Sequence, residues 1–288
     1  MSEIDRAISE STGIDFCTRT EASIGGGCIN QASKLCGVDG REFFIKKNRL
    51  SFLPFFQAEA QALREMKDTH TIRVPTVIAH GATQTQAYLV LEYIEEGSAG
   101  SNGQSTLGTF LAKMHRVVQP HFGWSIDNCI GATPQPNPRS ENWSAFYRDH
   151  RLAHQFDLAA NKGRKFEGAQ KLLVSIDSFF STYTPHPSLL HGDLWGGNAG
   201  YDRDGTPFLF DPASYYGDRE ADLAFTYMFG GFSSAFYDAY EKEYPVDPGF
   251  RIRKTLYNLY HELNHYNLFG GGYASSAQSS IDQLLQSL

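Results

Sequence analysis

The 288-residue sequence predicts an α+β protein with two lobes, a small β-rich lobe over residues 1–95 and a larger, mainly helical lobe over residues 96–288. Three observations support this prediction. Alternating apolar residues, typical of strands, dominate residues 21–94, and apolar residues at helical spacing dominate the chain after residue 107. A segment rich in glycine and serine, residues 97–105, lies between the two patterns and is typical of a connector.

The first lobe is expected to be a small sheet with one inserted helix. Apolar positions in residues 1–20 predict a short amphipathic helix, and Pro54 marks the start of a second helix, since proline is favoured in the first helical turn. The glycines at 25–27 and the pair Asp39-Gly40 predict turns between strands. The predicted strands are 29–35, 43–46, 74–80 and 87–93.

The second lobe is expected to consist of helices interrupted once by loops. Helical periodicity predicts helices over residues 107–118, 143–161, 165–183, 219–242, 249–268 and 276–287. The interruption, residues 191–213, contains two turns and a short strand around Phe208-Leu209-Phe210. Functional residues are often carried by loops on a rigid scaffold, so this interruption is the predicted site of the chemistry.

The most informative pattern is His191-Gly192-Asp193-Leu194-Trp195-Gly196-Gly197-Asn198, followed by Phe210-Asp211-Pro212-Ala213. Phosphoryl transfer from a nucleotide needs a carboxylate that orients the attacking hydroxyl, and then an amide and a second carboxylate that hold magnesium. This order predicts Asp193 as the catalytic base and Asn198 and Asp211 as the Mg²⁺ ligands, with ATP as the phosphoryl donor. His191 is expected to fix the shape of the loop rather than take part in the chemistry.

A second set of residues, in the first lobe, is suited to bind the phosphates of the nucleotide. Backbone N–H groups at Gly25, Gly27 and Cys28 are candidates to contact phosphate, although an ordinary hairpin turn would have the same composition. Lys46 ends an apolar strand and is the candidate cation for the α- and β-phosphates, whereas strand alternation places Lys47 on the other face. Glu59 is its expected ion-pair partner on the next helix, and Glu65 competes for that role. The P-loop sequence is missing, which argues against a P-loop NTPase.

The apolar strand that ends at Glu92, Tyr93 and Ile94 leads into the connector and is the candidate adenine contact, through the backbone groups of Glu92 and Ile94. His261-Glu262-Leu263-Asn264-His265 matches a zinc-binding pattern, H-E-x-x-H. Of the residues that follow it, Asp282 is the sole candidate for a third ligand, and aromatic residues crowd the segment. Packing and lining of a substrate pocket are therefore the favoured interpretation.

Composition and charge limit the classes of binding partner and the cellular compartment that we expect. A formal charge of −7 argues against nucleic acid or an anionic membrane as the main partner, and no apolar run is long enough to span a bilayer. Four scattered cysteines and an N-terminus without the features of a signal peptide indicate a reducing, cytoplasmic location.

The sequence resembles the fructosamine kinase (ketosamine-3-kinase) family, a branch of the protein-kinase-like fold related to aminoglycoside and choline kinases. The resemblance covers nearly the whole chain. It rests on Gly26 to Gln31, Phe122-Gly123-Trp124, Gln135-Pro136-Asn137, His191 to Asn198, Asp218 to Ala224, and Leu256 to Tyr273. The resemblance implies ATP-dependent phosphorylation of the 3-hydroxyl of a ketosamine, free or on a glycated protein, which yields an unstable adduct and so repairs the glycated amine.

The same resemblance gives roles to individual residues. It implies that Asp193 is the proton acceptor, that Lys46 and Glu59 orient the phosphates and that Glu92 to Ile94 contact adenine. Trp195 and Asp222 are candidate residues of the substrate site. Trp195 serves either as a sugar-facing wall or as a buried anchor, and Asp222 serves as a brace for the catalytic loop.

Alternatives remain open from the sequence. Oxidation of Cys28 in the phosphate loop, to an intermolecular disulfide for example, would block ATP binding and link a monomer into a dimer; the plain alternative is a small loop residue without a redox role. The competing functions are an aminoglycoside- or choline-type kinase and a pseudokinase that acts as a binding module.

Overall fold

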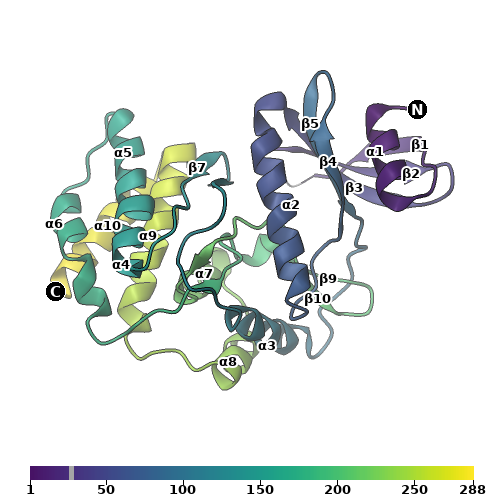
Figure 1. Cartoon of the computed structure of the whole chain (residues 1–288). Coiled ribbons are helices and arrows are strands. Elements are labelled where there is room, and N and C mark those ends of the chain that lie inside the picture. The colour runs from purple at the N-terminus through teal and green to yellow at the C-terminus, as the bar shows by residue number, and fades with distance from the viewer. Residues whose placement is uncertain (26–28) are drawn as a thin grey trace. The chain divides into compact units, whose positions relative to one another are not determined.

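The computed structural model describes residues 1–25 and 29–288, which form two compact units (Figure 1). The first unit contains residues 1–103 and 200–212, and the second contains residues 104–199 and 213–288. This division differs from the predicted boundary at residue 95 in two respects: the connector belongs to the first unit, and so does a hairpin from the middle of the chain. The Gly97 N–H donates to the Tyr201 carbonyl at 2.7 Å, which joins these two segments.

A five-stranded antiparallel sheet in the order β1-β2-β3-β5-β4 forms the centre of the first unit. Its strands are β1 (Thr18–Ser23), β2 (Gln31–Gly37), β3 (Glu42–Arg49), β4 (Val77–Ala82) and β5 (Gln86–Glu92). The predicted strands and the β2–β3 hairpin are thus present, and β1 is an addition to the prediction. Strand β5 is buried along most of its length because β3 and β4 flank it on both sides.

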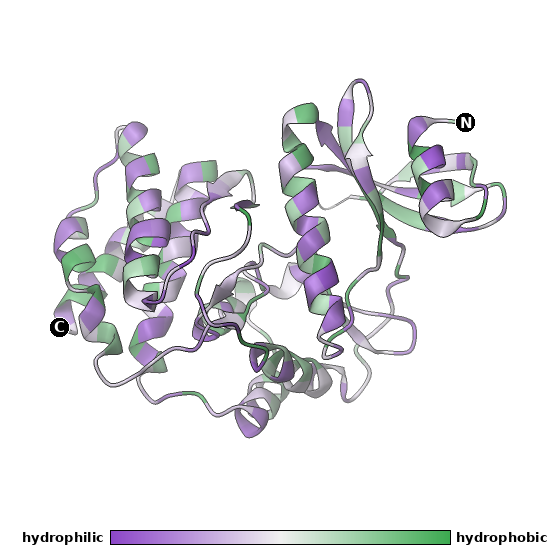
Figure 2. Cartoon of the chain, viewed as in Figure 1, coloured by the Kyte–Doolittle hydropathy of each residue, from purple (hydrophilic) through white to green (hydrophobic). Residues whose placement is uncertain are grey.

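Two helices cover the sheet. Helix α1 (Glu3–Thr12) begins with a capping box between Ser2 and Asp5 and packs Ile4 and Ile8 into the sheet core. Helix α2 (Leu53–Asp68) follows a short 3₁₀ turn (Leu50–Phe52), has proline in its first turn as predicted, and packs on β4 and β5. Its buried residues include Phe56, Leu63 and Met66, and hydrophobic and hydrophilic residues alternate along it, as expected for a helix with one buried face (Figure 2).

The hairpin that returns to the first unit consists of β9 (Ala199–Tyr201) and β10 (Pro207–Leu209). Arg73 ties it to the sheet, since its guanidinium contacts Asp202 in the hairpin and Glu92 at the end of β5. Strand β10 ends at Leu209, and Phe210 and then Asp211 follow it. The Arg73 ion pairs therefore hold Asp211, the candidate Mg²⁺ ligand, in the same unit as Lys46 on β3.

The second unit is mainly helical. Its helices are α3 (Gly103–His115), α4 (Trp143–Tyr147), α5 (His154–Asn161), α6 (Ala169–Val174), α7 (Glu220–Thr226), α8 (Ser234–Glu243), α9 (Phe250–Phe269) and α10 (Tyr273–Gln286). A π-helical segment (Arg148–Ala153) joins α4 and α5, and 3₁₀ turns lie at Ile176–Phe180, Gly196–Asn198 and Met228–Gly230. Its short strands are β6 (Asn128–Ile130), β7 (Thr133–Gln135), β8 (Ser188–Leu189) and β11 (Tyr216–Gly217).

The single helix predicted over residues 219–242 is wrong. The chain breaks between α7 and α8 because Phe229, Gly230 and Gly231 all adopt positive φ angles, which no α-helix accommodates. The helix predicted over residues 165–183 is also shorter than expected, since α6 and the following 3₁₀ turn are separated at Ser175. The other predicted helices are present.

Helix α9 organises the core of the second unit by packing against α5, α7 and α10. Arg253 on α9 makes a bidentate ion pair with Glu220 on α7 at 2.7 and 3.0 Å, and both side chains are almost fully buried. Tyr257 on α9 donates to Asp218 at 2.5 Å and accepts from the Trp143 indole at 2.9 Å. These bonds fix the position of α7, which carries Asp222.

Candidate functional site

The first unit brings together three of the predicted nucleotide-binding residues. The Lys46 Nζ on β3 lies 2.7 Å from Glu59 Oε1 on α2 and 2.5 Å from Asp211 Oδ1 after the hairpin. Glu65, the competing partner, accepts instead from Gln61 on its own helix. The ion pair predicted between Lys46 and Glu59 is therefore present, and Asp211 joins it.

The charges of this cluster stabilise one another. Burial alone would lower the pKa of the Lys46 ammonium, but the carboxylates of Asp211 and Glu59 raise that pKa above its usual value. Burial raises the pKa of Glu59, and the neighbouring ammonium opposes this shift. Lys46 therefore keeps its positive charge although only 4% of its surface is exposed. A permanent cation in a buried position suits a phosphate ligand.

Asp211 differs from its two partners in exposure and in backbone. Its side chain is 43% exposed, and its φ of 58° lies in the left-handed region, which aspartate tolerates better than most residues. Strained residues of this kind concentrate at functional sites. Asp211 is thus fixed by Lys46 on one side and still accessible to a ligand.

The glycine-rich turn is described only in part. Gly27 and Cys28 lie outside the described residues, and Gly25 occupies a bend two residues after the end of β1. At the far end of the turn, the Asn48 amide donates to the Ile29 carbonyl at 3.0 Å and to Asn30 Oδ1 at 2.7 Å. Asn48 lies two residues after Lys46, so β3 carries both the lysine and the anchor of this turn.

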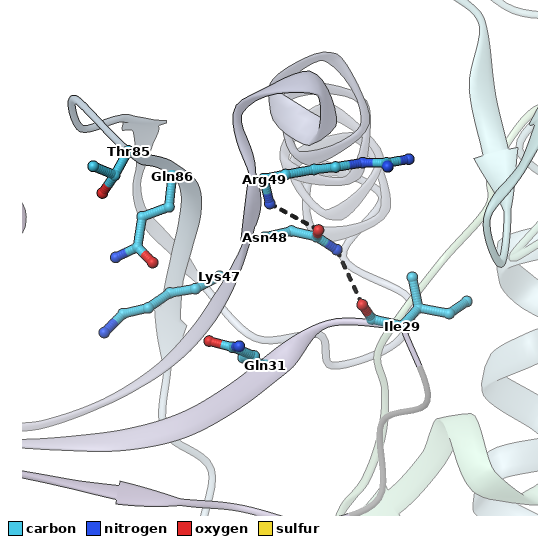
Figure 3. A pocket seen from close by; sticks show the side chains of 7 residues that line it. All are labelled: Ile29, Gln31, Lys47, Asn48, Arg49, Thr85 and Gln86. Atoms are coloured by element: carbon cyan, nitrogen blue, oxygen red, sulfur yellow. Dashed lines mark hydrogen bonds between the residues drawn. The ribbon is translucent and has the colours of Figure 1, made fainter.

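An open pocket of 270 Å³ lies beside that anchor (Figure 3). It is lined by Ile29, Gln31, Lys47, Asn48, Arg49, Thr85 and Gln86. Lys47 lines it, whereas Lys46 points to the other face of β3 and contacts Glu59. This pocket is therefore separate from the Lys46 cluster.

The predicted adenine contact lies at the end of β5. The Glu92 N–H already donates to the Thr76 carbonyl, and its carboxylate accepts from Thr76 and Arg73. Its side chain therefore has a structural role, and its backbone N–H is already paired within the unit. Tyr93 faces the Lys34 ammonium at 4.1 Å, and Ile94 is partly buried.

The second unit holds the predicted base and amide in one loop. The Asn198 Nδ2 donates to the Asp193 carbonyl at 2.8 Å and to Asp193 Oδ2 at 3.1 Å. This orientation leaves the amide oxygen of Asn198 for another partner. Gly192 has a φ of +83°, and a Cβ there would approach the Ala213 carbonyl oxygen to 2.1 Å, so the loop requires glycine next to Asp193.

Asp222 braces this loop from α7. Its carboxylate accepts from the His191 N–H at 2.7 Å and from the Gly192 N–H at 2.8 Å, and only 2% of its surface is exposed. Burial would raise the pKa of Asp222, but His115 and the loop amide lower it below its usual value. A buried carboxylate with these partners is placed to hold the loop, so the bracing role fits and a direct contact with substrate does not.

His115 on α3 supports Asp222 in turn. Burial lowers the pKa of His115, so the ring is neutral. Its Nε2 lies 3.1 Å from Asp222, which can only accept, so Nε2 carries the proton and Nδ1 accepts from the Tyr240 hydroxyl at 2.7 Å. The sequence signalled the burial of His115 but not this role: His115 lies four residues after Leu111, on the apolar face of the predicted helix.

Two buried amides, which we name the amide clamp, hold the chain just after Asp211-Pro212. Gln135 Nε2 donates to the Ala213 carbonyl at 3.1 Å, and Asn128 Nδ2 donates to the Ser214 carbonyl at 2.8 Å. Ala213 also donates its N–H to the His191 carbonyl. The clamp thereby links the catalytic loop to the segment after Asp211. Gln135 belongs to a motif noted in the sequence, but that motif did not reveal this role.

Replacing Gln135 with methionine is expected to lower the free energy of unfolding by about 1–3 kcal/mol, because the hydroxyl of Tyr260 and the carbonyl of Ala213 lose a buried partner. Chemical denaturation measures this change. Gln119→Met is the matched control at an exposed position, with an expected change below about 0.5 kcal/mol. Equal effects of the two variants would contradict the clamp.

The two histidines of the H-E-x-x-H segment on α9 make packing and backbone contacts. His261 stacks face to face on Phe225 with ring centroids 3.6 Å apart, and the His265 Nδ1–H donates to the His261 carbonyl at 2.7 Å. Across residues 1–25 and 29–288, no group of three or more His, Cys, Asp or Glu side chains is arranged to hold a metal. The interpretation as packing residues is therefore supported.

Burial lowers the pKa of His261 from 6.5 to about 3. A histidine in the unfolded chain takes up a proton near pH 6.5, whereas the folded one stays neutral, so acidification favours unfolding. Between pH 6.5 and pH 5 we expect the protein to lose about 1.5 kcal/mol of stability from this group alone. Denaturation of His261→Gln at both pH values should show that much less loss; an identical pH dependence would contradict the assignment.

The described residues thus contain two separate constellations. Lys46, Glu59 and Asp211 lie together in the first unit, and Asp193, Asn198 and Asp222 lie together in the second. Trp195 follows Asp193 in its loop, is 36% exposed and covers Gly197, whose Cβ would meet the indole ring at 2.3 Å. No helix in the described chain is long and apolar enough to cross a bilayer.

Comparisons with known proteins identify close relatives. A protein from Synechocystis assigned as a ketoamine kinase is 45% identical over 285 residues, which cover 98% of this chain and 96% of the relative. The chloroplastic protein-ribulosamine 3-kinase of Arabidopsis thaliana is 43% identical over 272 residues, covering 92% and 82% of the two chains.

Solved structures of similar proteins support the same relationship. A protein from Haemophilus somnus assigned as a fructosamine-3-kinase has a TM-score of 0.92 at 29% identity, with 98% of this chain and 96% of that chain covered. The choline kinase of Streptococcus pneumoniae, at 15% identity and a TM-score of 0.62 over the full length of both chains, shares the fold. The predicted α+β, protein-kinase-like fold is confirmed. The fructosamine kinase family model matches residues 1–287, and the chain belongs to that family.

Proposed function

We propose that the protein is an ATP-dependent kinase that phosphorylates the 3-hydroxyl of ketosamines, either free fructosamine and ribulosamine adducts of lysine or the same adducts on proteins. The observation that carries this proposal is the loop in which Asn198 holds Asp193 while Asp222 fixes the backbone beneath it. This loop supplies a positioned carboxylate for a hydroxyl. Family membership and the activities for which the relatives are named supply the acceptor class.

The proposed chemistry is a single in-line transfer. The 3-hydroxyl oxygen forms a bond to the γ-phosphorus while the bond from that phosphorus to the leaving ADP oxygen breaks, and the hydroxyl proton passes to the Asp193 carboxylate. Lys46, held by Glu59, contacts the α- and β-phosphates. Glu92 and Ile94 offer backbone groups to adenine, and the amides of Gly25, Gly27 and Cys28 contact the phosphates.

The donor atoms fit a magnesium ion. Mg²⁺ prefers a few hard oxygen ligands together with phosphates and water, and bound magnesium neutralises charge on the phosphates. Asn198 has its amide nitrogen committed to Asp193 and its oxygen available, and Asp211 offers an accessible carboxylate. We assign these two residues as the ligands. Trp195, exposed in the catalytic loop, is assigned to the face of the sugar.

The test supplies purified protein and Mg-ATP with fructosyl-, ribulosyl- and erythrulosyl-lysine, and with an aminoglycoside and choline as competing acceptors. ADP release gives the rate, and NMR of the product gives the phosphorylated position. We expect phosphate on O3 of at least one ketosamine. Turnover confined to the aminoglycoside or choline would replace the proposed acceptor, and nucleotide binding without turnover on any acceptor would indicate a binding module.

The proposed location is the cytoplasm, and the proposed partners are ketosamines and glycated proteins rather than nucleic acid or membrane. A redox role for Cys28 stays a proposal; Cys17 and Cys36 are free thiols. Peroxide treatment followed by mass spectrometry and non-reducing gel electrophoresis tests it. Full activity with unmodified Cys28 would exclude the switch, and a disulfide-linked dimer without ATP binding would support it.

A further inference from the structure

A strip of aromatic side chains starts in the catalytic loop of the second unit. We define this aromatic strip as Trp195, Phe229, His265, Phe269 and Tyr273. The ring centroids lie 5.6 Å apart for Trp195 and Phe229, and 5.4 Å apart for Phe229 and His265. His265 also contacts Tyr273 at 5.0 Å and Phe269 at 5.9 Å. The strip therefore runs without a break from two residues beyond Asp193 to α9 and α10.

Much of this apolar surface is exposed. Phe229 is 50% exposed, Phe269 is 59% exposed and Trp195 is 36% exposed. Phe229 has φ 56° and ψ 36°, a left-handed conformation that is rare and energetically costly for a bulky residue. Its half-exposed ring gains little burial to offset that cost. A strained backbone that presents an aromatic ring to solvent is typical of a binding site rather than of a core.

His265 adds one hydrogen-bond acceptor to the strip. Its Nδ1 lies 2.7 Å from the His261 carbonyl, which can only accept, so Nδ1 carries the proton. Burial lowers the pKa of His265, so the ring is neutral and Nε2 keeps its lone pair. Within the described residues, Nε2 has no hydrogen-bond partner. The strip thus offers π faces and a lone pair, and none of its five side chains carries a charge or an amide.

This combination fits a protonated amine better than a chain of hydroxyls. A cation is attracted to the faces of tryptophan, tyrosine and phenylalanine rings, and an ammonium N–H can donate to Nε2 at the same time. Sugar hydroxyls both donate and accept, and they are usually oriented by charged or amide side chains. In a ketosamine the secondary amine lies on the carbon next to the keto group, close to the 3-hydroxyl.

We propose that the aromatic strip is the subsite for the protonated amine of the ketosamine, with Phe229 as the cation-binding face and His265 Nε2 as the acceptor for its N–H, while Trp195 at the end of the strip faces the adjoining sugar. This proposal rests on the proposed function. It makes the strip the element by which the enzyme distinguishes a sugar attached to an amine from the same sugar alone.

The test compares fructosyl-lysine with 1-deoxyfructose, which has the same sugar chain without the amine. Three variants are measured: His265→Phe, which keeps a ring and removes the acceptor; Phe229→Leu, which removes a π face; and Tyr227→Leu as a control. Tyr227 is also an exposed aromatic residue, but it stacks on Tyr237 outside the strip. Thermal unfolding of each variant verifies folding.

For His265→Phe and Phe229→Leu we expect KM for fructosyl-lysine to rise about tenfold, consistent with the strength of a desolvated cation–π contact, while kcat and KM for ATP stay within twofold. The constants for 1-deoxyfructose, and all constants of Tyr227→Leu, should stay unchanged. An equal loss on both acceptors would show that the strip contacts the sugar hydroxyls and would overturn the proposal, as would unchanged KM values.

The two proposals fail in different ways. If the unaltered protein does not phosphorylate fructosyl-lysine or any other ketosamine, the proposed function is wrong. If it does, and the two strip variants have unchanged kinetics, only the amine subsite is wrong. Should His265→Phe not fold, Phe229→Leu alone decides the question, because residue 229 lies in an exposed turn.

Discussion

Replacing Asp193 with asparagine is expected to lower kcat by about 10²–10⁴, because the amide keeps the shape of the side chain but cannot accept the hydroxyl proton. Asn198 Nδ2 still has the Asp193 carbonyl as an acceptor, so the loop should keep its conformation. KM for ATP should change by less than threefold if Asp193 acts on the acceptor alone. Steady-state kinetics with Mg-ATP and isothermal titration with the non-hydrolysable nucleotide AMP-PNP measure the two quantities.

The matched control is Asp157→Asn, which makes the same chemical change at an exposed position on α5. Its kcat should equal that of the unaltered protein. If Asp193→Asn kept full kcat, Asp193 would not be the base. If it lost nucleotide binding together with kcat, Asp193 would instead help to hold the nucleotide.

Replacing Lys46 with methionine is expected to cost about 10²–10³ in kcat/KM, similar to the removal of one electrostatic donor from a transition-state site. Two carboxylates raise the pKa of this ammonium, so it is charged throughout the working pH range. Its loss leaves Glu59 and Asp211 without their cation, and their mutual repulsion should further weaken nucleotide binding. We expect KM for ATP to rise and kcat to fall.

Lys47→Met is the internal control. Lys47 lies next along β3, points to the opposite face and pairs with Glu21 at 2.7 Å, where the ion pair is partly exposed. Exposed pairs contribute about 0–1 kcal/mol, so this variant should keep its kinetics. Equal losses in both variants would mean that β3 had been disturbed as a whole and would remove the special role of Lys46.

The sequence predicted most of the first unit because its signals are local. Alternation gave the strands, Pro54 gave the start of α2, and the spacing of Lys46 and Glu59 gave the ion pair. The broken helix between α7 and α8 was missed because its signal, two glycines after Phe229, is also compatible with a helix that merely ends early. Its positive φ angles depend on contacts that are distant in sequence.

The candidate site shows the same contrast between local sequence signals and contacts that are distant in sequence. Roles for Asp193, Asn198 and Asp211 could be proposed from the sequence because phosphoryl transfer needs these residue types in this order, and these roles stay predictions. Asn128, Gln135, His115 and Tyr240 act through hydrogen bonds to residues far along the chain, and amides, imidazoles and phenols are common in any core. Nothing in their local sequence separates a supporting role from simple packing.

The late return of residues 200–212 to the first unit has a consequence for biosynthesis. Lys46 and Asp211 are separated by 165 positions, so the ribosome must make nearly three-quarters of the protein before this contact can form. Until then the nascent first unit has its sheet but lacks its hairpin, and Lys46 has Glu59 as its partner there. Contacts of such separation form slowly, and domains usually fold as they emerge. Maturation of the first unit should therefore be a late event, completed only when translation has passed residue 212.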